Sequence, residues 1–215
     1  MNSQTEKLSL QGAAGPIEAA RDAPRPGTVA HGGLAVIAHP HPLFGGTMDN
    51  KVVQTLARAF IACGWTAVRF NFRGVGASAG THDEGRGEAE DLLAVVRQVA
   101  PEGPLAIGAF SFGAFVAINA LQTLWTERDV RQLVLVGASV ARVAPAPLPP
   151  QAHERTLLVH GEADDTVPFD ALLDWARPQS LPVTVVPGGG HFFHGQLPLL
   201  KSLVVRHLRS EAGAD

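Results

Sequence analysis

Cysteine is nearly absent from the 215-residue sequence, which contains only Cys63. One thiol cannot form a disulfide within the chain, so the small disulfide-rich secreted scaffolds are excluded. The N-terminal segment 1–7 is polar and carries an acidic residue, unlike a secretory leader. We therefore expect a cytoplasmic protein in a reducing compartment.

Long apolar runs and clusters of basic residues are also missing. No stretch approaches the ~18 apolar residues of a membrane span. Seventeen basic and 20 acidic residues give a net charge of −3. We therefore expect neither a membrane nor a nucleic acid as a partner. Charged residues make up only 17% and hydrophobic residues 46%, which excludes a disordered chain and allows a large core.

Short apolar runs alternate with stretches of helical periodicity. The runs that predict strands are 33–38, 66–70, 105–109, 133–136, 156–160 and 183–186. The helical stretches are 49–63, 87–99, 112–125, 168–177 and 196–209. This alternation predicts an α/β fold, a doubly wound and mostly parallel sheet with helices on both faces. We expect one domain over residues 1–215, with a β-hairpin within 1–20 at the sheet edge.

The connection 137–155 separates two predicted strands and contains four prolines, at positions 145, 147, 149 and 150. Proline interrupts helices, so the segment has room for a loop and one helical turn. We therefore expect no cap domain.

Ser111 lies where the strand 105–109 turns into the helix 112–125. Ligands of such sheets bind at the carboxyl ends of the strands. A nucleophilic serine needs a sharp turn flanked by small residues, here Ala109 and Gly113. Ala109 departs from the pattern G-x-S-x-G, which has glycine there. The alternative is that Ser111 is an ordinary N-cap of the helix.

Two other predicted strands are followed by residues that could act together with a nucleophilic serine. Asp164 comes after the strand 156–160, and His191 comes after Pro-Gly-Gly-Gly at the end of 183–186. A carboxylate can orient a histidine, and a histidine can take the proton of a serine. His194 is interpreted as an ordinary surface residue. The chain order Ser, Asp, His is that of a hydrolase sheet.

Five motifs carry a resemblance to a known family: HPHPLFGGTMDN at 39–50, RFNFRGVGAS at 69–78, the Ser111 turn, HGEAD at 160–164 and HFFHG at 191–195. Together they resemble the α/β-hydrolase superfamily, and more closely its small lidless bacterial serine hydrolases related to dienelactone-hydrolase-like enzymes. The resemblance implies Ser111 as nucleophile, His191 as general base and then acid, and Asp164 as the carboxylate that orients His191.

An oxyanion hole needs two N–H donors. The first is expected from Phe112, directly after the nucleophile at a helix N-terminus. The second is expected from the loop after the strand 33–38, where the prolines at 40 and 42 have no N–H. The remaining candidates are His41, Leu43 and Phe44, of which we choose Leu43.

Metal and nucleotide sites are the main alternatives for two of these motifs. His39 and His41 form an H-x-H pair, but a catalytic zinc needs about three protein ligands and no companion motif is present. We expect one of the two histidines to brace the loop. The stretch 71–76 lacks G-x-G-x-x-G, and Arg73 is expected to brace loops by ion pairing. We therefore expect no metal and no cofactor.

The sequence predicts a serine hydrolase that cleaves small, soluble carboxylic esters through an acyl-serine intermediate. Phe44, Phe110 and Phe192 flank the predicted site and are expected to contact the small-molecule ester, with core packing as the alternative. A peptidase, a thioesterase or a lactonase on the same triad is a further alternative. A ligand sensor without turnover is another, since a fold does not determine a substrate.

Overall fold

The computed structural model describes residues 5–25, 27–28 and 32–210. The other residues of the predicted domain 1–215 lie outside this description. One eight-stranded sheet runs through the molecule in the order β1-β2-β4-β3-β5-β6-β7-β8. Its strands are β1 (Glu6–Gly12), β2 (Gly15–Asp22), β3 (Leu34–Ala38), β4 (Thr66–Phe70), β5 (Leu105–Phe110), β6 (Val130–Val136), β7 (Thr156–Gly161) and β8 (Thr184–Val186).

The sheet is parallel from β4 through β3 and β5 to β8, whereas β1 and β2 form an antiparallel hairpin at one edge. This is the doubly wound sheet that the alternation of patterns predicts. The strand β6 begins three residues before the predicted 133–136. Polar Arg131 and Gln132 interrupt the apolar pattern there, but pairing with β5 extends the strand.

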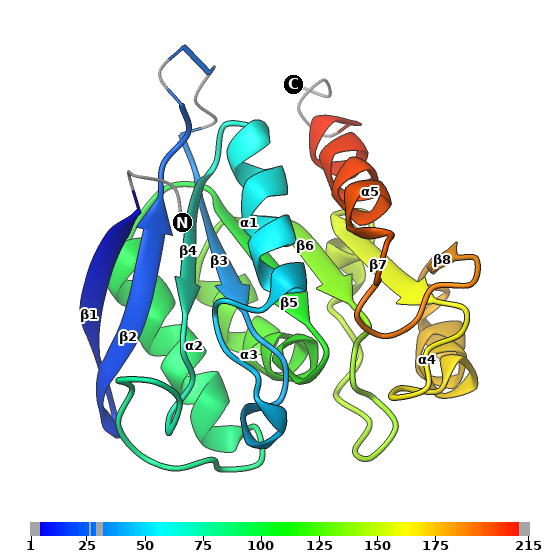
Figure 1. The fold of residues 1–215 in the computed structure, drawn as a ribbon, viewed down its shortest axis with the longest axis horizontal. Helices are drawn as coiled ribbons and strands as arrows, with labels where there is room; N and C mark the ends of the chain where they lie inside the picture. Colours follow the sequence, from blue (N-terminus) through cyan, green and yellow to red (C-terminus); the bar gives the residue numbers. More distant parts are fainter. Residues whose placement is uncertain (1–4, 26, 29–31, 211–215) are drawn as a thin grey trace.

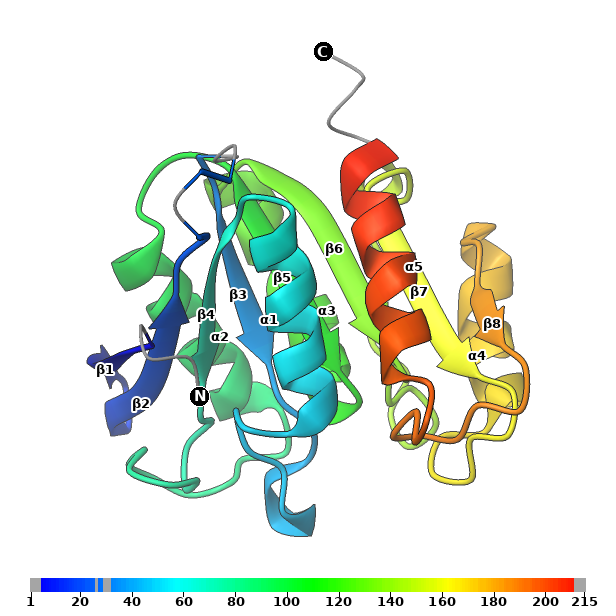
Figure 2. The ribbon, with the colours of Figure 1, turned by 45° about the horizontal axis from the view of Figure 1, so that its top comes forward.

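In the described part of the chain, five α-helices cover the two faces of the sheet (Figure 1). They are α1 (Lys51–Ala62), α2 (Arg86–Val99), α3 (Phe112–Glu127), α4 (Phe169–Ala176) and α5 (Leu197–Ser210), with 3-10 turns η1 (Pro42–Phe44), η2 (Pro150–Ala152) and η3 (Arg177–Gln179). One face is covered by α1 and α5, which lie side by side in Figure 2. The other is covered by α2, α3 and α4.

The core consists of two apolar clusters, one on each face. Along β3, Ala35 and Ile37 pack with α1, while Val36 and Ala38 pack with α2 and α3. Side chains of a strand alternate between the faces, so a continuous apolar run is buried on both. This is why the short runs of the sequence predict the central strands well.

The parallel strands all have their carboxyl ends on the same side of the molecule. The arrowheads of β3, β6 and β7 point to this side in Figure 1. The connection 137–155 contains only the turn η2, so no cap domain lies between β6 and β7. Among the described residues, no helix has the length and apolar character needed to cross a membrane.

Candidate active site

Ser111 occupies a strained turn between β5 and α3. Its dihedral angles are φ 57° and ψ −120°, in a region that L-residues rarely adopt. Its N–H donates to Val136 O at 2.9 Å. Its side chain caps no N–H of α3, so the alternative reading as an ordinary N-cap is wrong. The hydroxyl therefore projects from the turn toward the edge of the sheet where the other candidate residues lie.

Small residues allow the sharp turn to form. A Cβ atom at Gly113 would lie 2.5 Å from His39 O, so the close approach of α3 to the end of β3 requires glycine. Ala109 is fully buried and keeps its register with Ala38 and Leu135 in the neighbouring strands. Alanine in place of the glycine of G-x-S-x-G is therefore compatible with the turn.

The structure brings Ser111, His191 and Asp164 into one hydrogen-bonded chain. His191 Nε2 lies 2.9 Å from Ser111 Oγ, and His191 Nδ1 lies 2.7 Å from Asp164 Oδ2. All three residues are buried. Because an ionised carboxylate can only accept, Nδ1 carries the proton and Nε2 presents its lone pair to the serine hydroxyl.

The carboxylate of Asp164 is held on both of its oxygens. Its Oδ1 accepts the N–H groups of Thr166 and Val167 at 2.9 and 2.8 Å, while Oδ2 faces His191. Burial by itself raises the pKa of Asp164. The hydrogen bonds from His191 and the two N–H groups outweigh burial and hold the pKa below its ordinary value. The carboxylate thus stays ionised beside the imidazole.

A close backbone contact holds the loop that carries His191 against the end of β7. A Cβ atom at Gly161 would lie 2.2 Å from Gly189 O. The same carbonyl accepts the N–H of Ala163 at 2.9 Å. The glycines after β8 therefore let the chain fold back against the strand that carries Asp164.

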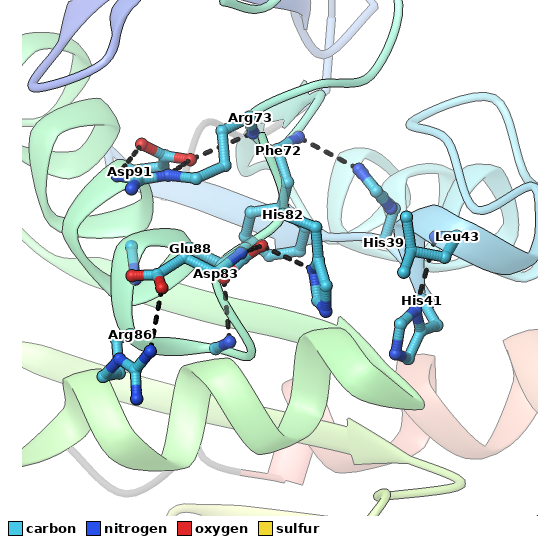
Figure 3. Close-up of polar contacts among 12 residues, drawn as sticks. His39, His41, Leu43, Phe72, Arg73, His82, Asp83, Arg86, Glu88 and Asp91 are labelled. Carbon is cyan, nitrogen blue, oxygen red and sulfur yellow. Dashed lines mark hydrogen bonds and ion pairs between the residues drawn. The ribbon is translucent and has the colours of Figure 1, made fainter. Parts of the chain in front are cut away.

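His39 braces the loops after β3 and β4, as the sequence predicts for one histidine of the pair. Its Nδ1 donates to Pro40 O at 2.6 Å, and its Nε2 accepts the N–H of Phe72 at 3.0 Å (Figure 3). Burial lowers the pKa of His39 to about 4, so the ring is neutral at neutral pH. Within the described part of the chain, no group of three His, Cys, Asp or Glu side chains could hold a metal ion.

The N–H groups of the loop after β3 differ in whether they have a hydrogen-bond acceptor. Leu43 donates its N–H to His41 Nδ1 at 3.3 Å, and Phe44 donates to His41 O at 3.1 Å. The N–H groups of His41 and Phe112 have no acceptor among the residues that the structure describes. These two N–H groups are free to bind an external oxygen.

A pocket of about 740 Å³ opens beside Phe112. Its walls come from the loop after β3, the loop before α2, the first turns of α2 and α3, and the loop after β6. The residues are His41, Leu43, Phe44, His82, Glu84, Gly85, Arg86, Ala89, Phe112, Phe115, Asn119, Ser139, Arg142 and Val143. No residue of the triad lies on these walls. The pocket thus adjoins His41 and Phe112, the two residues with free N–H groups, and no residue of the loop that carries His191 lines it.

The three phenylalanines expected to contact substrate have different positions. Phe44 lines the pocket and is 75% exposed. Phe192 is partly exposed on the other side, with its ring edge against His191. Phe110 is fully buried and packs against the His191 ring, with centroids 4.9 Å apart. The prediction that Phe110 contacts substrate is wrong, because its position on a strand covered on both faces places the ring in the core.

Arg73 braces the loop after β4, as predicted from the sequence. Its Nε and Nη2 donate to the two oxygens of Asp91 at 3.0 and 2.9 Å (Figure 3). Its N–H also donates to Asp91 at 3.0 Å. The buried Asp91 on α2 thus ties that loop to the helix.

Sequence reasoning missed a second histidine–carboxylate pair, His82 and Glu88. Glu88 is fully buried and accepts from His82 Nδ1 at 2.7 Å and from the N–H groups of Asp83 and Gly85 at 2.9 and 2.8 Å. In a capping box, a glutamate stands three residues after the N-cap, which is the residue just before the helix. This pattern could have located Glu88. Its burial beside a histidine could not be read from that signal.

Comparison with known proteins agrees with this fold. A serine hydrolase without a lid from Xanthomonas campestris is 34% identical, with a TM-score of 0.84 over 98% of this chain and 96% of that chain. An α/β serine hydrolase homologue from Coxiella burnetii is 37% identical, with a TM-score of 0.80 over 94% and 97%. An uncharacterised protein of Rickettsia prowazekii is 30% identical over 74% of this chain and 71% of its own length.

The chain belongs to the α/β-hydrolase superfamily, and within it to the family described as serine aminopeptidase, S33, whose model matches residues 43–158. The protein is therefore a hydrolase, and the predicted superfamily is confirmed. The closer kinship to dienelactone-hydrolase-like enzymes stays a prediction.

Proposed function

We propose that the protein is a serine esterase that hydrolyses small carboxylic esters through an acyl-serine intermediate. The observation that carries this proposal is the buried chain from Ser111 Oγ through His191 to Asp164, with distances of 2.9 and 2.7 Å. A hydroxyl so placed loses its proton to the imidazole as it attacks a carbonyl carbon.

In the first half of the reaction, Ser111 Oγ bonds to the ester carbonyl carbon while its proton passes to His191 Nε2. The carbonyl oxygen becomes an oxyanion. When the tetrahedral intermediate collapses, the bond to the alcohol oxygen breaks and the alcohol leaves with the proton from His191. In the second half, His191 takes a proton from water, which attacks the acyl-serine, and then returns it to Ser111 as the acid leaves. Asp164 keeps His191 in the required tautomer throughout.

The oxyanion is held by the N–H groups of Phe112 and His41. Both lack an acceptor in the described structure, which is what a preorganised oxyanion hole requires. Leu43, our choice from the sequence, is less well suited because its N–H already donates to His41 Nδ1. His41 was among the three candidates of the sequence, and its free N–H supports it over the other two.

An ester fits the pocket better than the free amine of an aminopeptidase substrate. The family description favours a peptidase as the second candidate. Recognition of an α-ammonium group requires an accessible carboxylate. Of the pocket residues only Glu84 is acidic, whereas Arg86 and Arg142 are basic. The pocket therefore has no excess of negative charge to bind a cation, which supports an uncharged or anionic substrate.

Active-site labelling combined with a substrate panel tests the proposal. A fluorophosphonate should label the wild type once, at Ser111, and should not label Ser111→Ala. The panel contains p-nitrophenyl esters, a thioester, a lactone and aminoacyl p-nitroanilides, with Ser111→Ala as the matched control. Esters should give the highest kcat/KM. Faster turnover of the anilides would replace the esterase by a peptidase, and labelling without turnover would favour a ligand sensor.

A further inference from the structure

His82 lies outside the triad, on the wall of the 740 Å³ pocket, and its partner Glu88 is buried behind it. A fully buried carboxylate is costly unless hydrogen bonds satisfy it. Two backbone N–H groups and His82 Nδ1 do so here. Because the carboxylate only accepts, Nδ1 of His82 must donate, and in the tautomer that carries its proton on Nδ1 the ring presents Nε2 as an acceptor.

His41 also lines the pocket, but its Nε2 is a donor, whereas that of His82 is an acceptor. Its Nδ1 accepts the N–H of Leu43, so the proton of the neutral ring is on Nε2, which donates. Burial, together with the nearby charge of Arg142, lowers the pKa of His41, which favours this neutral form. The two imidazoles extend in the same direction in Figure 3, with ring centroids 4.8 Å apart.

Both Nε2 atoms are available to a ligand. Neither has a hydrogen-bond partner among the described residues, and neither belongs to the buried polar atoms that lack one. Both rings also contact the ring of Phe112, with centroid distances of 4.7 Å for His41 and 5.3 Å for His82. A donor and an acceptor thus lie together at the apolar entrance of the pocket.

The pocket is on the acyl side of the scissile bond, an assignment that rests on the proposed function. His191 must protonate the leaving alcohol, so the alcohol lies on the side of His191 and Phe192. No residue of the loop that carries His191 lines the pocket. The acyl group therefore extends from the oxyanion hole past Phe112, His41 and His82.

We propose that this pocket selects esters whose acyl group carries a hydroxyl, which accepts a hydrogen bond from His41 Nε2 and donates one to His82 Nε2. A hydroxyl is both donor and acceptor, so it satisfies both rings, whereas an ether, a methylene or a carboxylate leaves His82 Nε2 without a donor. Glu88 is the positioning residue, because its carboxylate determines which nitrogen of His82 faces the substrate.

A carboxylate on the acyl group is the competing ligand, since Arg86 and Arg142 also line the pocket. Arg86 is already paired with Asp83 at 3.0 Å. Arg142 is exposed to water, where a charge pair contributes little. The fixed pair of imidazoles is therefore the better defined recognition element.

The test compares ethyl hexanoate with ethyl hydroxyhexanoates that carry the hydroxyl at each carbon from the third to the sixth. Their methyl ethers and monoethyl adipate complete the series. The test variant is His82→Asn, whose amide nitrogen replaces Nδ1 toward Glu88 while Nε2 is lost; His82→Phe is the second variant. His194→Asn, an exposed histidine outside the pocket, is the matched control. Affinity for the same esters is measured in Ser111→Ala, and in Ser111→Ala combined with His82→Asn.

For the best hydroxyl position we expect kcat/KM about tenfold above that of ethyl hexanoate, the effect of one well-formed hydrogen bond. The ratio should fall to near one for the methyl ether and in both His82 variants, and it should persist in His194→Asn. A ratio near one in the wild type, an unchanged ratio in His82→Asn, or preference for the adipate would overturn the proposal. If no ester is turned over, the esterase function fails, and the affinity ratio in Ser111→Ala still decides the inference.

Discussion

Replacing Ser111 by glycine should leave the protein more stable than replacing it by alanine, although both variants lose the hydroxyl. The reason is the backbone of Ser111, with φ 57° and ψ −120°. These are the angles of the first central residue of a type II′ turn, where glycine is favoured. Alanine keeps the Cβ atom and hence the strain, whereas glycine removes both.

The size of the difference follows from two opposing effects. A non-glycine residue held in such a region costs roughly 1–3 kcal/mol. Glycine loses more backbone freedom on folding, which offsets about 0.4–1 kcal/mol of the gain. The glycine variant should therefore exceed the alanine variant by about 1 kcal/mol in free energy of unfolding, or about 2–4 °C in Tm for a domain of this size.

Urea unfolding and thermal melting of the two variants measure this difference directly, without interference from activity. Ser139 provides the control, because it lies in a nearby loop and is not among the described residues with positive φ. At Ser139 the order should reverse, with alanine more stable than glycine. If the alanine variant at Ser111 equals or exceeds the glycine variant, the turn is not strained and the reasoning fails.

Three further predictions concern catalysis, acid stability and substrate length. His191→Ala should lower kcat/KM for p-nitrophenyl esters by at least about 10³-fold, since the triad acts as a unit, whereas His194→Ala should cost less than about tenfold; the reverse order would make His194 the base. The pKa of His39 is about 4 in the folded protein and 6.5 ordinarily. As the pH falls through this window, the unfolded chain binds a proton that the folded protein does not, and stability drops by up to roughly 3 kcal/mol. Urea titrations should show a shallower drop in His39→Gln, and an equal drop would contradict the assignment. Leu43 and Phe44 at the pocket rim are 69% and 75% exposed, and no cap covers them. Each CH₂ left in water forgoes about 0.8 kcal/mol, so kcat/KM should peak at hexanoyl esters or shorter ones. A maximum at palmitoyl esters, or activation at an emulsion boundary, would refute this.

The fold and the triad geometry follow closely from local patterns. The helix predicted over 112–125 is observed as α3, and the strand predicted over 66–70 is observed at the same residues. Ser111, Asp164 and His191 each follow a strand of the parallel part of the sheet, and the carboxyl ends of parallel strands lie together. The position of each residue just after a parallel strand therefore predicts that the three side chains lie close together.

Interactions between distant segments were not predictable in this way. Whether an N–H in the loop after β3 is free depends on how that loop folds, and only the structure distinguishes His41 from Leu43. Phe110 looks like a neighbour of the nucleophile in the sequence, yet it lies in the core because its side chain points to the face covered by α1 and α5.

The sequence by itself determined which residues are the candidates for catalysis, since strand runs, sharp turns and reactive side chains are local features that can be read from the sequence. Only the tertiary structure decided the surroundings of that chemistry. Glu88 reads as an ordinary capping residue at the start of a helix, but packing buries it completely and turns His82 toward the pocket. Burial and hydrogen-bond pairing depend on which segments meet in space, and no local pattern contains that information.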